Sequence, residues 1–224
     1  MANFTRNGYG QVEPNQLSAQ KTGQIYASLP LDKEVNVLQN GEFMYYDYAN
    51  GSVNCGKAAD ADKGIVATAG EPMLVFNEIK LYEPFWRTSY KDFAMIRVNN
   101  VNPSTGAITP GENYVTSDYP FQRYGDGATT DPISPDPAHT EYGYRMDGFA
   151  PRLFKTNVGD VYTTNMVKTG VEYKVGDKLT PVVSASSKTM VLEKTSAPSG
   201  MLWSVVKVYT MPDGQPGLKL QRVQ

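Results

Sequence analysis

The last third of the chain decides the fold. It begins with NVGDVYTTNMV at residues 157–167, and it includes LWSVVKVYT at 202–210. Apolar and polar residues alternate along five short runs: Asp160–Val167, Val171–Lys174, Thr189–Glu193, Leu202–Thr210 and Gly217–Val223. Turn signals separate the runs, and Val-Gly-Asp occurs twice, at 158–160 and 175–177. This pattern predicts a small antiparallel barrel or sandwich spanning residues 156–224.

The last two runs are joined by the sequence MPDGQP at residues 211–216. Proline presets its own φ and glycine accepts positive φ, so the sequence favours a turn between two paired strands. The module contains no set of residues that could do chemistry. It therefore looks like a part built for binding or assembly.

Residues 31–98 are also rich in predicted strands. Glu42–Tyr48 alternates and then meets Asn50-Gly51, a strong hairpin signal. Further apolar runs lie at Val35–Leu38, Ile65–Thr68, Met73–Tyr82 and Phe93–Val98. One short helix fits near Tyr82–Lys91, but no segment has the pattern of a three-turn amphipathic helix. This part either stands alone or forms one domain with the final module.

Two segments lack such patterns. Residues 1–30 are polar and show no sustained period, so we expect an extended N-terminal arm that becomes ordered only where it lies on something. Residues 99–155 combine seven prolines with scattered aromatic residues. A disordered linker would lack the aromatics. We therefore expect a long loop-rich insertion that packs on its own core or on a neighbouring subunit.

Composition limits the classes of partner. The chain has 224 residues, 21 basic and 23 acidic, with a formal net charge of -2. This balance argues against nucleic acid as a partner. No apolar stretch approaches the length needed to span a bilayer, and the N-terminus has no apolar region typical of a secretory signal. We expect a product made or assembled in the cytoplasm.

Few residues are candidates for chemistry. His139 and Cys55 are the only histidine and cysteine, and neither has convergent partners in the sequence. Asp60-Ala-Asp62-Lys-Gly64 with Glu71 departs from a calcium loop because Ile65 stands where glycine is needed. Asp126, Asp131 and Asp136 are typical of turns beside proline. We expect no catalytic residue, metal or cofactor, and hence no enzyme.

Aromatic residues are the better candidates for function, because tyrosine combines a large contact area with a polar tip. The pairs Phe85-Trp86 and Tyr45-Tyr46 could stack sugars, pack a core or meet a protein partner. The candidate interface residues are Phe4, Tyr9, Tyr26, Phe85, Trp86, Tyr119, Phe121, Tyr124, Tyr142 and Tyr144.

Taken together, the chain resembles the head decoration (cement) proteins of tailed bacteriophages. The polar arm, the stretch Asn40–Gly51 and the closing module carry the resemblance; in the module it lies in Val175–Leu179, Met190–Leu192, Leu202–Tyr209 and Gly217–Val223. Together these cover roughly half of the chain. We assign no counterpart in that family to the insertion at 99–155.

The resemblance implies a non-enzymatic virion protein on the capsid surface. Its partner would be the major capsid protein, whose neighbouring subunits it would bridge as a dimer or trimer, after assembly in the host cytoplasm. Alternatives remain open: another virion part such as a tail-tube or head-completion subunit, or a carbohydrate-binding or host-adhesion module. An enzyme would need two carboxylates about 5–10 Å apart in a cleft.

Overall fold

A computed structural model of the chain describes residues 3–6, 10–35, 37–56, 70–77, 94–101, 108–117, 144–146, 150–184, 188–196, 200–211 and 214–224. In 94–101, 108–117 and 144–146 it describes the backbone alone. The described part is almost entirely strands, which confirms the predicted all-β class. Its helix is α1 (Ser18–Thr22), which ends where Gly23 takes a φ of 69°.

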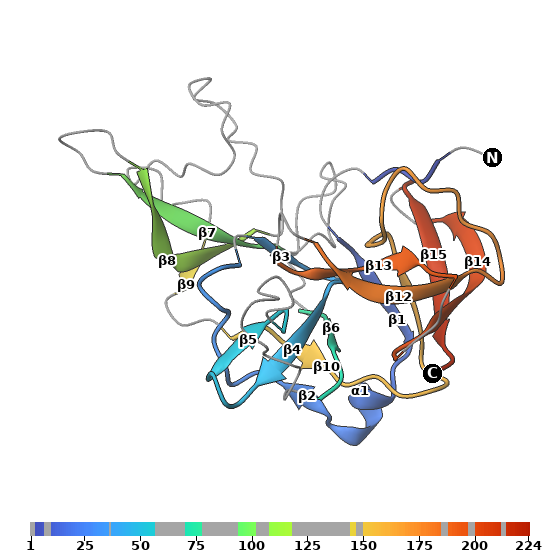
Figure 1. Cartoon of the computed structure of the whole chain (residues 1–224), viewed down its shortest axis with the longest axis horizontal. Coiled ribbons are helices and arrows are strands. Elements are labelled where there is room, and N and C mark those ends of the chain that lie inside the picture. Colours follow the sequence, from blue (N-terminus) through green and yellow to red (C-terminus); the bar gives the residue numbers. More distant parts are fainter. Residues whose placement is uncertain are drawn as a thin grey trace.

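The larger sheet has eleven strands among the described residues and curls into half of a barrel (Figure 1). Its neighbours in order are β1 (Val12–Gln16), β11 (Val161–Thr164), β15 (Pro216–Arg222), β14 (Trp203–Thr210), β12 (Lys178–Val183), β13 (Met190–Lys194), β4 (Phe43–Asp47), β6 (Met73–Val75), β10 (Leu153–Phe154) and β2 (Ile25–Tyr26). The eleventh strand, β5 (Ser52–Asn54), pairs with β4 beside this path.

A smaller sheet lies beside it. This sheet follows the order β3 (Val37–Gln39), β7 (Ala94–Val101), β8 (Ile108–Ser117) and β9 (Tyr144–Met146). The turn Gln39–Glu42 joins β3 directly to β4 of the large sheet, so the two sheets meet at this point (Figure 1).

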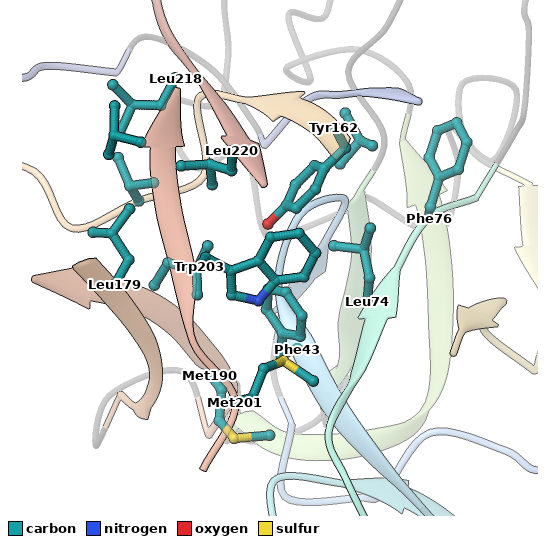
Figure 2. Packing of buried hydrophobic residues seen from close by; sticks show 14 of the residues in the cluster. Phe43, Leu74, Phe76, Tyr162, Leu179, Met190, Met201, Trp203, Leu218 and Leu220 are labelled. Carbon is teal, nitrogen blue, oxygen red and sulfur yellow. The ribbon is translucent and has the colours of Figure 1, made fainter. Parts of the chain in front are cut away.

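The half-barrel closes around an apolar core. On β14 and β15, Trp203, Val205, Leu218 and Leu220 are buried, while the intervening residues reach the surface. Figure 2 shows Trp203, Leu218 and Leu220 together with Tyr162, whose ring meets that of Trp203 edge-on at 4.9 Å between centroids. The alternation that predicted these strands is therefore the alternation between core and solvent.

Both predicted hairpins are present. β14 pairs with β15 along most of its length, and in the connecting turn the Gly214 N–H donates to the Met211 carbonyl. β4 pairs with β5 across a turn in which Gly51 has a φ of 62°.

In the final module one predicted strand was wrong and one strand was missed. Val171–Lys174 is not a strand; its backbone instead binds Phe4, whose N–H donates to the Val171 carbonyl at 2.9 Å. The strand β12 was not predicted, because it contains Pro181. Proline fits there because β12 pairs with β14 only at Lys178 and Leu179, which leaves Pro181 beyond that ladder.

The N-terminal segment is part of the fold, which corrects the expectation of an arm. β1 pairs with β11, and β2 pairs with β10. Between them Leu17 and Ala19 are fully buried. Backbone pairing at an edge needs no alternating side chains, so the sequence pattern did not reveal it.

The segment 99–155 also contributes strands rather than loops alone. β8 and β9 belong to the smaller sheet and β10 to the larger one. Strands from 31–98 and from 156–224 share the large sheet, where the pair Met190 and Phe43 joins β13 to β4. The short helix expected near Tyr82–Lys91 lies outside the described residues.

Candidate functional site

Two of the predicted interface residues have described side chains, and both pack within the chain. Phe4 is 5% exposed and meets Tyr173 edge-on at 5.7 Å between ring centroids. Tyr26 is half-buried against Tyr46, with the ring centroids 5.2 Å apart. Tyr46 is itself buried and hydrogen-bonds Ser28 through its hydroxyl. These rings stabilise the core rather than offering a surface.

The other predicted interface residues are not placed by their side chains. Tyr144 lies in β9, where the backbone alone is described. Outside the described residues lie Tyr9, Phe85, Trp86, Tyr119, Phe121, Tyr124 and Tyr142.

The residues weighed for chemistry give no assembled centre in the described part. Cys55 is buried and is not part of a disulfide. His139, the sequence 60–64 and the three aspartates at 126, 131 and 136 lie outside the described residues. Within the described ranges, no three His, Cys, Asp or Glu side chains gather in a way that could hold a metal ion.

Glu42 is the buried acid with the clearest shift in pKa. Its carboxylate accepts a hydrogen bond from the Gln39 N–H at 2.8 Å and another from the Thr189 hydroxyl at 2.8 Å. Burial raises the pKa of Glu42 to about 7, although these hydrogen bonds and the charge of Arg6 act in the opposite direction. The side chain is 1% exposed, so it serves the junction of the two sheets and not a surface.

The surface is more informative than the interior. Three large apolar side chains in the described residues are far more exposed than the others: Tyr48 at 71%, Val175 at 68% and Val158 at 67%. The next most exposed, Val206, is at 45%. Each of the three side chains lies on a tight turn whose backbone is hydrogen-bonded by an aspartate. We call the turns that carry Tyr48, Val158 and Val175 the docking turns.

The first docking turn is Asn157–Asp160, which leads into β11. The Asp160 N–H donates to the Asn157 carbonyl at 3.0 Å, and the Asp160 carboxylate accepts the Asn157 N–H at 2.9 Å. Gly159 has a φ of 96°, a conformation that favours glycine. The same carboxylate also binds Ser18 at the start of α1. Val158 therefore sits on a fixed backbone.

The second docking turn is Lys174–Asp177, which leads into β12. The Asp177 N–H donates to the Lys174 carbonyl at 3.1 Å, and the carboxylate accepts the Lys174 N–H at 2.8 Å. Gly176 has a φ of 92°. Burial alone would raise the pKa of Asp177, but the ammonium of Lys194 at 2.8 Å and the Lys174 N–H outweigh it and lower the pKa. The carboxylate is thus held ionised.

The third docking turn follows β4 and carries Tyr48. The Asp47 carboxylate accepts the N–H groups of Ala49 at 3.0 Å and Asn50 at 3.1 Å. Burial acts to raise the pKa of Asp47, but the amide hydrogen bonds of Asn50 and Asn54 outweigh it, so the pKa is lowered. The Tyr48 ring rests edge-on against Tyr46 at 5.0 Å.

Sequence reasoning missed the docking turns as sites. The repeated Val-Gly-Asp motif could be recognised in the sequence, and Asp side chains commonly stabilise turns by hydrogen-bonding to the backbone. The exposed fraction of the valines was not visible, because it depends on which way each turn leaves the sheet. The turn tips are therefore additional candidates for an interface, while the aromatic residues whose side chains are not described stay a prediction.

Comparisons with known proteins give no relative for this chain: no family model, no curated protein and no solved structure matches it. Among the described residues, no helix is long and apolar enough to cross a membrane.

Proposed function

We propose that the chain is a non-enzymatic virion structural protein. In this proposal it binds the outer surface of a tailed-phage capsid and stabilises the shell by bridging neighbouring copies of the major capsid protein. The choice of the capsid protein as partner rests on the family resemblance in the sequence. In this proposal the exposed side chains of the docking turns contact that partner.

The observation that carries the proposal is the arrangement of the exposed apolar side chains. Tyr48, Val158 and Val175 project from turns whose backbones are fixed by aspartate hydrogen bonds. Covering exposed apolar groups with a partner removes them from water, and this favours binding. Because the turns are already ordered, little conformational entropy is lost on binding.

A shell also favours a protein with modest contacts. Each turn tip offers a small apolar area and therefore a weak contact. Several tips on one molecule, and many molecules on one shell, add by multivalency. A protein that binds the assembled shell and not its separated parts stabilises the shell by mass action.

The test is co-sedimentation of the purified full-length chain with shells of the tailed phage that encodes it, assembled without the chain. Saturable binding at a fixed number of copies per shell supports the proposal. No binding at micromolar concentration overturns it. Light scattering on the free chain tests the expected dimer or trimer, and a glycan array tests the carbohydrate-binding alternative.

A further inference from the structure

The two Val-Gly-Asp turns have the same structure in detail. In each, the glycine N–H donates to a neighbouring strand and that same strand residue returns an N–H to the aspartate carbonyl. Gly159 donates to Arg222 at 2.9 Å, and Arg222 donates to Asp160 at 2.9 Å. Gly176 donates to Val205 at 2.8 Å, and Val205 donates to Asp177 at 2.9 Å. Both turns are therefore anchored to the sheet by identical pairs of hydrogen bonds.

The equivalence extends into the strands that follow. Tyr162 of β11 pairs with Leu220 of β15, and Leu179 of β12 pairs with Trp203 of β14. Equivalent residues differ by 17 throughout, as in 160 and 177, 162 and 179, 203 and 220, and 205 and 222. All four paired side chains are fully buried. The unit β11-β15-β14-β12 is thus two matched halves about its central hairpin.

Matched outer strands on either side of an antiparallel hairpin are related by a two-fold axis normal to the sheet. β11 and β12 run in opposite directions and are three strand spacings apart, about 14 Å. Each docking turn precedes its strand, so Val158 and Val175 lie at diagonally opposite corners of the unit. Their exposed fractions, 67% and 68%, are nearly equal.

We infer that these two turns are equivalent contact sites, each binding the same apolar pocket on a different copy of one partner protein. The inference rests on the proposed function and adds how the chain would contact two copies of its partner. Opposite corners cannot reach one small pocket together, whereas two copies flanking the unit can each meet one tip. The chain would then sit on a local two-fold axis of the shell and hold two subunits together.

The experiment measures apparent affinity for shells assembled without the chain. The variants are Val158→Asp, Val175→Asp and the double variant, because an acid at the tip opposes burial in an apolar pocket. The control is Thr169→Asp, which adds the same charge at an exposed turn residue elsewhere. Near-ultraviolet circular dichroism checks the fold, and the serine substitutions at 158 and 175 replace any aspartate variant that fails to fold.

We expect each single variant to lose about 100-fold in apparent affinity, because losing one of the two equivalent contacts reduces the multivalent gain. The two losses should agree within about three-fold, the double variant should bind more weakly than either single variant, and the control should match the wild type. The inference is overturned if one single variant binds as poorly as the double while the other binds normally, or if all variants bind like the wild type. Failure of the wild-type chain to bind shells would instead remove the proposed function, and this inference with it.

Discussion

Glu42 is the residue whose ionisation should matter most for stability. Its pKa is about 7 in the folded chain against an ordinary value of 4.5, so the folded state holds the proton more tightly. Stability therefore falls as the pH rises through this interval, by about 3 kcal/mol once the carboxyl is fully ionised. Glu42→Gln imitates the protonated form and can still bond Gln39 and Thr189.

We expect urea unfolding at pH 5 and pH 8 to show this loss in the wild type and its absence in Glu42→Gln. The exposed Glu34 supplies the control, since Glu34→Gln should keep the wild-type pH dependence. An equal fall in stability for Glu42→Gln and the wild type would contradict the assignment.

Two buried tyrosines offer a matched comparison. The Tyr162 hydroxyl is fully buried and has no hydrogen-bond partner in the part of the chain that the structure describes, whereas the Tyr173 hydroxyl donates to the Lys168 carbonyl at 2.8 Å. Replacing a buried tyrosine by phenylalanine removes an unsatisfied group in the first case and leaves an acceptor unpaired in the second. Tyr162→Phe should be neutral or stabilising by about 1 kcal/mol, and Tyr173→Phe destabilising by about 1 kcal/mol. Chemical denaturation that ranks the two variants in the opposite order would refute this reading.

At the scale of elements, the two Val-Gly-Asp turns should respond alike to substitution. Gly159 and Gly176 have positive φ, and an added Cβ would meet no atom within 4 Å at either position. The penalty for alanine is therefore one of backbone conformation, about 1 kcal/mol in each turn. Asparagine, which tolerates this conformation better, should lose less at both positions. Thermal unfolding that gives clearly different losses for Gly159→Ala and Gly176→Ala would argue against equivalent turns.

The N-terminal segment should be needed for folding. Deleting residues 2–16 removes β1 and the buried side chains of Phe4 and Val12. Losing a buried phenylalanine alone typically costs about 3–5 kcal/mol, so we expect a large drop in the melting temperature or no folded protein. The exposed edge residue Gln16 supplies the control, because Gln16→Ala should change stability by less than about 0.5 kcal/mol. A truncated chain with the melting temperature of the wild type would restore the idea of a separate arm.

What the sequence could reveal depended on how each element is stabilised. β14 and β15 were predictable because one face of each is buried, and the turn at 211–216 carries its own chemistry. β1 was not, since it is an edge strand whose residues after Glu13 are exposed and whose pairing uses the backbone. β12 was hidden by Pro181, which lies beyond the β14 ladder. For the candidate site, the repeated Val-Gly-Asp motif could be recognised in the sequence. The exposure of Val158 and Val175 could not be predicted, because it depends on the tertiary fold.

At the scale of the whole molecule, the described core and surface have separate roles. The apolar half-barrel and the hydrogen-bonded junction around Glu42 fix the relative positions of the strands. The docking turns then project apolar side chains from that fixed frame. A rigid frame with small apolar tips suits a molecule that connects other proteins, since its contacts are set before binding.

The central claim is that the chain bridges neighbouring subunits of a capsid through these turns. The most direct measurement is a cryo-electron microscopy reconstruction of shells saturated with the full-length chain. We expect density in which each bound chain lies across a local two-fold axis, with Val158 against one capsid subunit and Val175 against its neighbour. Ordered density in which both turns face solvent, or shells that bind no chain, would contradict the account.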